Sequence, residues 1–357
     1  MDLHWLVAPC HLPSGAHREA AIARQQRLTK PAGALGRMEQ VAIELAALQG
    51  RAQPRVAQVP VLLFAADHGI AARGVSAYPP EVTVQMLGNF AAGGAAISVL
   101  ARELGLDLHV RDVGTLADGP VPGVTLDRSR RGTADLSLGP AMEMDDLVHA
   151  LDAGRRAFVA AAGERTDLLV LGEMGIGNTT AGSALVAMLG PAALDAVVGA
   201  GTGLDPARIL HKQQLLAAAL ELHAGAVARA PVPALEALRR VGGLEIAAMA
   251  GAMVHAAGRG VPVLVDGFIV SAAALVAVRL NPQVRPWLLF SHRSAERGHA
   301  RVLELLDAVP LLELDLRLGE GSGAALAVPL LRMACALHNR MATFEEAAVS
   351  GLGGTAA

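Results

Sequence analysis

The chain has 357 residues with a formal net charge of −3, and 53% of its residues are hydrophobic while only 3% are aromatic. This length has room for one large domain, or for a large domain with a small one. The near-neutral charge gives no basis for a nucleic-acid partner or for binding to an anionic membrane surface. A core built from Ala, Val and Leu is typical of α/β proteins with buried parallel strands.

The cysteines and lysines are informative because each type occurs only twice. Cys10 and Cys335 lack metal-ligand spacing, so we expect reduced thiols in a cytoplasmic protein without a metal or a cofactor. The first residues do not resemble a signal peptide, and the longest uncharged stretch, residues 174–194, contains glycines and a proline, so we expect no membrane span. Every other basic residue is Arg, which suggests that Lys30 and Lys212 mark places that need a compact ammonium group; chance is the alternative.

Hydrophobic periodicity predicts two N-terminal helices, over residues 17–27 and 36–48, and then an alternation of strands and helices. The predicted strands cover residues 59–65, 106–113, 167–171, 261–265, 286–290 and the apolar run 311–318. The predicted later helices cover residues 81–90, 94–104, 144–162, 178–189, 206–229, 230–240, 244–257, 267–280, 295–306, 322–337 and 343–348. Residues 114–140 lack periodicity and are interpreted as an exposed, mobile loop.

Alternating strands and helices predict an α/β fold with a parallel, doubly wound sheet. Functional loops of such a sheet lie at the carboxyl ends of its strands. Polar and glycine residues do follow the predicted strands, at Asp67-His68-Gly69, Asp112-Val113-Gly114, Gly172-Glu173, Asp266-Gly267, Ser291-His292 and Gly319-Glu320.

Two glutamates, Glu173 and Glu320, stand in glycine-rich turns that each follow an apolar run and precede a helix pattern. A helix start offers free backbone N–H groups to an anion. A carboxylate side chain placed in such a turn is unfavourable unless it has a functional role. We interpret both as active-site carboxylates; the alternative for Glu320 is a tight turn with an exposed side chain. Residues 319–324 also match a dinucleotide fingerprint loosely, but too little chain follows for the rest of that unit.

Two further segments predict a site for a phosphate and a ribose. Gly175-Ile176-Gly177-Asn178-Thr179-Thr180 offers N–H groups and side chains that cap a helix or bind an oxyanion. Residues 199–205 form a second glycine cradle, with Lys212 seven positions after Asp205. The alternatives are a plain capped helix for the first segment and, for Lys212, a stem that covers helix surface.

Two histidine-containing segments are weaker candidates. For Asp67-His68-Gly69 a structural role in a turn is favoured over a metal site, because no ligand cluster accompanies it. In residues 291–299, Ser294 is interpreted as a helix cap with Glu296 in the first turn, rather than as the nucleophile of a hydrolase.

In this order, the motifs resemble those of one family, the nicotinate-nucleotide–dimethylbenzimidazole phosphoribosyltransferases of cobalamin lower-ligand synthesis. The resemblance covers roughly residues 28–351, and Ala34 stands where the family pattern suggests Ser. The matching segments are Lys30-Pro31-Ala32-Gly33-Ala34-Leu35-Gly36, Ala66-Asp67-His68-Gly69, Gly74-Val75-Ser76-Ala77-Tyr78-Pro79, Val82-Thr83-Val84-Gln85-Met86, Asn89-Phe90, Gly93-Gly94-Ala95-Ala96-Ile97, residues 172–180, residues 199–205 with Lys212, Val265-Asp266-Gly267, residues 291–299 and residues 317–323.

The resemblance implies a homodimer with a Rossmann-like parallel sheet and a small helical domain made from both chain ends. The small domain would comprise residues 1–58 with about 330–357, and the large catalytic domain residues 59–329. It further implies that Glu320 is the general base and Glu173 the second catalytic carboxylate. The implied phosphate and ribose residues are Gly175, Gly177, Asn178, Thr179, Thr180, Gly201, Gly203, Lys212, Asp266 and Ser291, and the implied base-binding residues are Ser76, Gln85 and Leu318.

The implied reaction transfers 5-phosphoribosyl from nicotinate mononucleotide to 5,6-dimethylbenzimidazole, giving α-ribazole 5′-phosphate and nicotinate. The sequence leaves the preferred acceptor base open. One alternative is a non-catalytic sensor of nicotinate mononucleotide. Another is an NAD-dependent oxidoreductase, which would need a glycine fingerprint after the first strand, where Asp67-His68-Gly69 stands instead.

Overall fold

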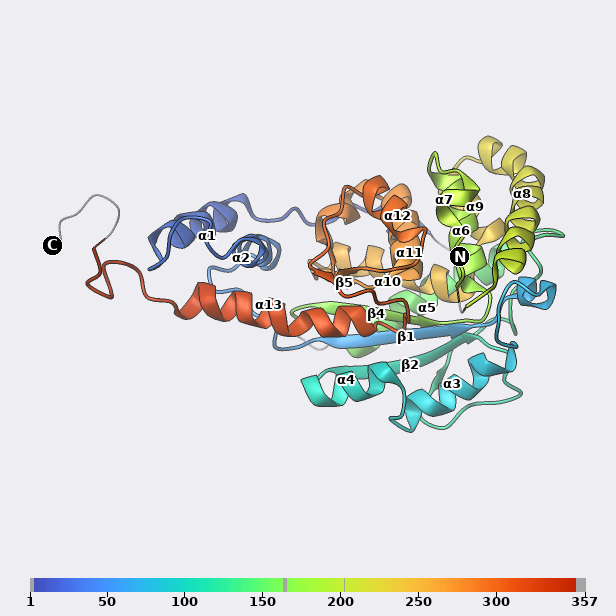
Figure 1. Cartoon of the computed structure of the whole chain (residues 1–357), viewed down its shortest axis with the longest axis horizontal. Helices are drawn as coiled ribbons and strands as arrows, with labels where there is room; N and C mark the ends of the chain where they lie inside the picture. Colours follow the sequence, from blue (N-terminus) through green and yellow to red (C-terminus); the bar gives the residue numbers. More distant parts are fainter. Residues whose placement is uncertain (1–2, 163–165, 202, 351–357) are drawn as a thin grey trace.

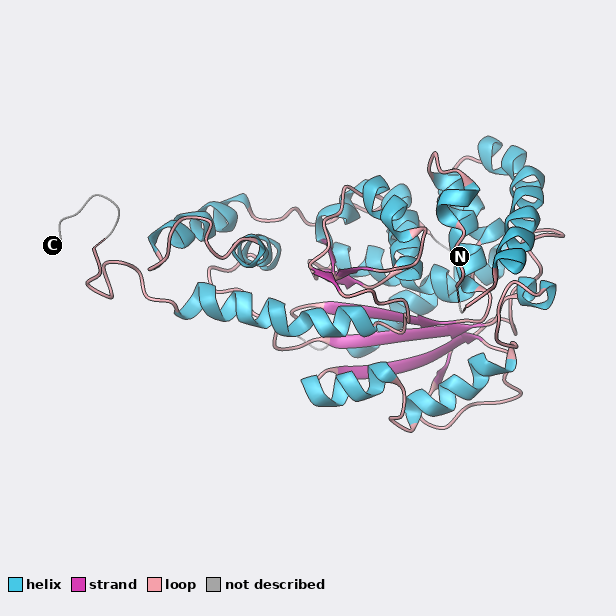
Figure 2. Ribbon diagram, viewed as in Figure 1, coloured by secondary structure: helices cyan, strands magenta, loops and turns pink. Residues whose placement is uncertain are grey.

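The computed structural model describes residues 3–162, 166–201 and 203–350. Its centre is a six-stranded sheet with the order β3-β2-β1-β4-β5-β6, in which every neighbouring pair is parallel (Figure 2). The prediction of an α/β fold with a parallel sheet flanked by helices is therefore confirmed. The strands are β1 (Pro60–Ala66), β2 (Asp107–Gly114), β3 (Thr125–Leu126), β4 (Leu169–Met174), β5 (Val263–Val265) and β6 (Leu288–Phe290).

Helices cover both faces of the sheet, so all seven residues of the central strand β1 are buried. On one face, Leu62 and Phe64 of β1 pack with α5 (Met144–Ala161), α10 (Leu244–Gly258) and α11 (Phe268–Leu280). On the other face, Val61 and Leu63 pack with α3 (Glu81–Ala91), α4 (Ala96–Leu104) and α13 (Ser322–Arg340). The side chains of β1 alternate between these two cores, which is the period-2 geometry of a strand.

The remaining elements extend this three-layer arrangement (Figure 1). Two helices near the N-terminus pack on each other and on α13, and five more follow strands β4 to β6. They are α1 (Gly15–Arg27), α2 (Arg37–Gln49), α6 (Asn178–Leu189), α7 (Leu194–Val197), α8 (Pro206–Arg229), α9 (Pro233–Val241) and α12 (His299–Leu305), with the 3₁₀ helices η1 (His4–Leu6), η2 (Gly69–Arg73) and η3 (Pro282–Trp287). Two short parallel strands, β7 (His292–Arg293) and β8 (Leu312–Glu313), form a separate two-stranded sheet.

Segments from the two terminal regions of the chain pack together at one end of the molecule, where α1 and α2 lie beside the C-terminal half of α13 (Figure 1), whereas η1 packs on α10. Arg24 of α1 donates to the carbonyl of His338 at 2.6 Å, and Leu28 forms a β-bridge with Thr343. Helix α13 passes through residue 330 without a break, so one helix belongs to both of the parts that the sequence predicts. The division into a small and a large domain stays a prediction.

The last predicted strand and the last predicted helix are wrong. In the apolar run 311–318 only Leu312–Glu313 form a strand, which pairs with β7 rather than with the central sheet, and Asp315 has a φ of 54°. Residues 343–348 form turns instead of a helix: Thr343 and Glu346 exchange capping hydrogen bonds, but Ala348 leaves the helical region with a φ of 52°. So short a segment does not sustain helix propagation.

Two other segments differ from their predictions. Residues 114–140 are not simply an exposed loop, because they supply the edge strand β3 and bury Leu136 in the core. Polar contacts organise them, such as the bond from Arg128 to Asp112 at 3.0 Å, and these leave no hydrophobic period in the sequence. The helix expected from residue 295 begins only at His299, with Gly298 at its N-cap, so Ser294 does not cap it.

One described segment, Glu81–Leu104, is long and apolar enough by composition to cross a membrane, with a mean hydropathy of 1.4. The structure divides it into α3 and α4, with the turn Gly93-Gly94 between them. Helix α3 has 11 residues and is therefore about 17 Å long, shorter than a hydrocarbon core. The segment is thus not one continuous helix of membrane length.

Candidate active site

A cavity of about 490 Å³ lies where the carboxyl ends of β4 and β5 face the start of α13. Glu173 on β4, Asp266 directly after β5 and Glu320 directly before α13 all line it. The sheet brings these residues together because parallel strands place their carboxyl ends on one edge. Although Glu320 does not follow a strand of the central sheet, it reaches the same edge through the extended segment after β8.

The two glutamate-bearing turns touch each other through their glycines. A Cβ on Gly172 would lie 2.2 Å from the carbonyl oxygen of Glu320, and one on Gly319 would lie 2.2 Å from Oε1 of Glu173. Gly319 also has a φ of 87°, which disfavours any side chain there. The glycines are therefore needed so that two distant segments of the chain can place their carboxylates in one cavity.

Glu173 is buried and holds a proton unusually tightly. Its Oε2 accepts a short hydrogen bond from the side-chain amide of Asn178, the first residue of α6. Burial, and then the negative charges of Glu245 and Asp266, raise the pKa of Glu173 to about 8. At neutral pH and without substrate this group is therefore mostly a carboxylic acid, which a nearby cation would ionise.

Replacing Glu173 with Gln is expected to increase the free energy of unfolding by about 1–3 kcal/mol at pH 8. The folded wild-type protein keeps this proton up to a pKa of about 8, while the unfolded chain loses it near 4.5. The folded state therefore binds more protons across this window, so wild-type stability falls as the pH rises through it. Urea denaturation of both proteins at pH 5 and pH 8 measures the effect. If the variant lost as much stability between pH 5 and pH 8 as wild type does, the prediction would be contradicted.

Glu320 sits in a strained turn with its carboxylate buried in the cavity wall. Its φ is 64°, and Gly319 and Gly321 on either side are also left-handed. Such a conformation costs a non-glycine residue about 1–2 kcal/mol and is often stored at functional sites. Oε2 accepts from the backbone N–H of Ile97 at 3.4 Å. Burial raises the pKa of Glu320 despite that hydrogen bond, and the charge of Asp266 adds to the rise.

Asp266 holds the Glu320 turn against the sheet. Its Oδ1 accepts from the backbone N–H of Ala324 at 2.8 Å, and its Oδ2 accepts from that of Gly321 at 3.2 Å. Both N–H groups lie at the start of α13, where the backbone has no acceptor within the helix, so a carboxylate satisfies them well. Asp266 therefore positions Glu320, in addition to lining the cavity where the sequence predicts a ribose contact.

Lys212 of α8 does not line the cavity itself: its side chain is 0% exposed and lies behind Thr179, which does line it. Its Nζ donates to Oγ1 of Thr179 at 2.8 Å, and burial lowers the pKa of Lys212 to about 8. A Cβ on Gly201 would lie 3.0 Å from Thr179 Oγ1 and 3.8 Å from Lys212 Nζ, so the glycine cradle and the ammonium group adjoin each other. The alternative of a stem lying on the helix surface does not fit such complete burial.

The predicted capping of α6 by Asn178, Thr179 and Thr180 is wrong. The N-cap is Gly177, with a φ of 99° and no side-chain hydrogen bond. Asn178 and Thr179 instead bind Glu173 and Lys212, so both are committed to the cavity. The hydroxyl of Thr180 is fully buried and has no hydrogen-bond partner among the described residues.

The structure gathers only some of the predicted phosphate and ribose residues around the cavity: Gly175, Asn178, Thr179, Gly201 and Asp266 line it. Ser291 is fully buried beside it, with its hydroxyl 2.9 Å from Nδ1 of His292. Gly203 lines an adjoining cavity of about 400 Å³, which also contains Gly201. Gly177, Thr180 and Lys212 do not line either of these two cavities, and the phosphate and ribose roles of all ten residues remain predictions.

Of the predicted base-binding residues, Leu318 lines the cavity while Ser76 and Gln85 do not. Gln85 is exposed on α3, and the hydroxyl of Ser76 accepts from the backbone of Tyr78 at 3.3 Å. The cavity is lined instead by Tyr78, Val82 and Met86, which sequence reasoning missed. The spacing of four residues between Val82 and Met86 was an available signal, because it places these two on one face of α3, whereas Tyr78 precedes that helix.

His68 packs beneath the first glycine turn, as its expected structural role requires. Its Nε2 lies 2.8 Å from Oε1 of Glu245, and both side chains are fully buried. A Cβ on Gly177 would lie 3.2 Å from the Cβ of His68. Among the described residues, no group of three or more His, Cys, Asp or Glu side chains is placed to hold a metal ion.

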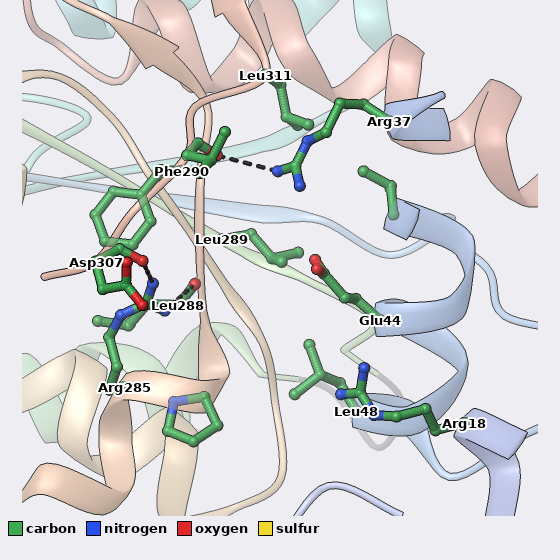
Figure 3. A pocket seen from close by; sticks show the side chains of 13 residues that line it. Arg18, Arg37, Glu44, Leu48, Arg285, Leu288, Leu289, Phe290, Asp307 and Leu311 are labelled. Atoms are coloured by element: carbon green, nitrogen blue, oxygen red, sulfur yellow. Dashed lines mark hydrogen bonds between the residues drawn. The ribbon is translucent and has the colours of Figure 1, made fainter. Parts of the chain in front are cut away.

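A different cavity of about 240 Å³ lies between the α1–α2 pair and β6 (Figure 3). Three arginines and two acidic residues line it with apolar side chains. Arg37 and Arg285 use guanidinium donors on backbone carbonyls, at 3.0 Å to Val309 and 2.6 Å to Asp307. None of the residues predicted for the phosphoribosyl reaction lines this cavity between the α1–α2 pair and β6.

Comparisons with known proteins point to one family. A family model described as "Phosphoribosyltransferase" matches residues 10–349. The chain is 62% identical over 347 residues to a nicotinate-nucleotide–dimethylbenzimidazole phosphoribosyltransferase of Bradyrhizobium sp. (strain ORS 278), covering 97% of this chain and 98% of that protein. It is 55% identical over 350 residues to the protein of that name from Pseudomonas syringae pv. syringae (strain B728a), covering 98% and 99%.

The fold agrees with a solved structure as well. The crystal structure of such a phosphoribosyltransferase from Thermus thermophilus superposes with a TM-score of 0.88 at 45% identity, over 95% of this chain and 99% of that one. The chain is thus an enzyme of the phosphoribosyltransferase class. It belongs to the nicotinate-nucleotide–dimethylbenzimidazole phosphoribosyltransferase family, as its motifs predict, and the oxidoreductase alternative is wrong.

Proposed function

We propose that this enzyme transfers 5-phosphoribosyl from nicotinate mononucleotide to 5,6-dimethylbenzimidazole, giving α-ribazole 5′-phosphate and nicotinate for the lower ligand of cobalamin. The observation that carries the proposal is one cavity lined by two buried glutamates and a glycine cradle, with a buried lysine bonded to Thr179 in its wall. The relatives named above carry the substrates of this reaction in their names. On the same basis we propose a cytoplasmic homodimer that acts on small molecules.

The donor's phosphate fits the end of the cavity formed by Thr179, Gly201 and Lys212. Lys212 supplies a positive charge, and the backbone of Gly201 lies close enough for its N–H to contribute. Anchoring the phosphate there fixes the ribose between Glu173 and Glu320. Such positioning of two reactants supplies a large part of the catalysis of a bimolecular reaction.

Glu173 stabilises the positive charge of the donor and of the transition state. The pyridinium ring of the nucleotide is cationic, so its arrival beside Glu173 lowers the raised pKa of this group and ionises it. When the bond to C1′ breaks, the ring nitrogen keeps the electron pair and becomes neutral. The positive charge then develops on the ribose, where the Glu173 carboxylate stabilises it.

Glu320 acts as general base on the acceptor. The benzimidazole carries one N–H, and its other nitrogen attacks C1′ from the face opposite to the departing nicotinate, so the anomeric centre changes from β to α. Glu320 accepts the N–H proton during this attack, and burial moves its pKa upward, toward that of an effective base. Tyr78, Val82, Met86 and Leu318 offer the apolar wall against which the flat acceptor ring would lie.

Mass spectrometry of the products tests the proposed function. The enzyme is mixed with nicotinate mononucleotide and, one at a time, a panel of dimethylbenzimidazole, benzimidazole, adenine and a phenol. We expect release of nicotinate together with a nucleotide whose mass shows that the added base has replaced nicotinate, in the highest yield with dimethylbenzimidazole. Binding of the nucleotide without release of nicotinate for any base would favour the sensor and overturn the proposal.

A further inference from the structure

A carboxylate already stands in the cradle that the substrate phosphate would enter. Glu296 belongs to the loop between β7 and α12, and it lines both the main cavity and the adjoining one. It accepts a hydrogen bond from the backbone N–H of Gly201. A Cβ on Gly199 would lie 2.8 Å from Oε2 of Glu296, so the glycine leaves room for the carboxylate.

The charges of Lys212, Glu296 and Arg317 compensate one another. Lys212 is fully buried, and among the described residues its ammonium has one hydrogen-bond partner, Thr179. A buried cation needs a nearby anion, and Glu296 supplies that charge. Arg317 lines the same two cavities and also attracts Glu296. The cradle is therefore a balanced set of two cations and one anion, with one of its N–H groups already in use.

An incoming phosphate would compete with Glu296 for the same N–H group and the same ammonium. Two anions at this short range repel each other, and the buried setting screens that repulsion weakly. Free inorganic phosphate makes no contacts outside the cradle that would offset its repulsion from Glu296. A phosphate attached to a ribose and a pyridinium ring is held at high effective concentration once the rest of the nucleotide is bound.

We propose that Glu296 is a specificity-determining residue, which excludes free phosphate from the cradle and is displaced toward Arg317 by the phosphate of a bound nucleotide. This inference rests on the proposed function for the identity of the nucleotide. Selection of this kind works by a built-in repulsive contact against the wrong ligand. It would leave the enzyme active at the phosphate concentrations of a cell.

Calorimetric titration with inorganic phosphate tests the inference directly, with wild type, Glu296→Gln and the control Glu304→Gln. Glu304 lies on the neighbouring helix α12, where it is exposed and pairs with Arg301. We expect phosphate to bind Glu296→Gln at least about tenfold more tightly than wild type, because the variant keeps an acceptor for Gly201 but loses the charge. The control should bind like wild type, and adding Lys212→Met to Glu296→Gln should abolish the gain.

A phosphate affinity of Glu296→Gln equal to or below that of wild type would overturn the inference. Thermal unfolding verifies that the variants fold, and Glu296→Ala, which should change phosphate affinity in the same direction, replaces a variant that does not. This readout needs no turnover. If wild type forms no α-ribazole 5′-phosphate, the proposed function fails, while the phosphate titration still decides the role of Glu296.

Discussion

Glu320→Gln is expected to lower kcat by a factor on the order of 10²–10⁴, the usual contribution of a positioned general base. Gln is nearly isosteric, and its amide oxygen still accepts from the N–H of Ile97, so the strained turn keeps its geometry. The variant has no group that takes the proton from the benzimidazole. Steady-state kinetics with both substrates measure kcat and KM separately.

The control for this variant is its binding of the donor. Nicotinate mononucleotide should bind to Glu320→Gln within a fewfold of wild type, because the proposed phosphate contacts involve Thr179, Gly201 and Lys212 rather than Glu320. In wild type, kcat should rise with pH as Glu320 loses its proton, at a pH above the ordinary range of a glutamate because burial raises this pKa. A rate like that of wild type in the variant would remove Glu320 from the mechanism.

Lys212→Met should weaken nicotinate mononucleotide binding by a factor on the order of 100 or more, and at the same time should not destabilise the fold. Losing one partner of a buried, hydrogen-bonded charge pair costs about 2–5 kcal/mol in binding. Without ligand, however, Lys212 is a desolvated cation with one hydrogen bond to Thr179 among the described residues. Replacing it with an apolar side chain of similar length removes that desolvation cost, while Glu296, the anion that faces Lys212, keeps Arg317 as a cationic partner.

Two measurements on the same sample separate these effects. Calorimetry gives the dissociation constant of the nucleotide, and thermal unfolding without ligand gives Tm, which should equal or exceed that of wild type. Arg301→Met on α12, where the arginine is partly exposed and pairs with Glu304, is a control that should change neither quantity substantially. Unchanged nucleotide affinity in Lys212→Met would place the phosphate elsewhere.

Hydrophobic patterns predict most of the central fold because burial sets them. All seven residues of β1 are buried, and α10 and α11 consist largely of small apolar residues, so these elements are evident without coordinates. The glycine turns that carry Glu173 and Glu320 are visible in the same way, since each departs from its apolar surroundings. The family resemblance then adds the order of the motifs, which no single motif provides.

Tertiary contacts determine what the sequence does not reveal. The contact between the Gly172 and Gly319 turns, which lets both carboxylates share a cavity, depends on a meeting of distant backbones. The sequence predicts a ribose contact for Asp266, but its bonds to the start of α13 follow from where that helix lies. The segment after β8 has the apolar pattern of a strand, yet Leu314 and Leu318 are more than half exposed and the segment pairs only briefly with β7.

Helix α13 has a mechanical consequence for this enzyme. It starts two residues after Glu320 and runs for 19 residues, a length of about 28 Å with Pro329 in its interior, and its far end is tied to α1. A tilt of the α1–α2 pair would therefore be passed along α13 toward the turn that holds Glu320, the proposed general base. The contacts between the two terminal regions of the chain thus bear on the position of this carboxylate, although they lie at the far end of the helix.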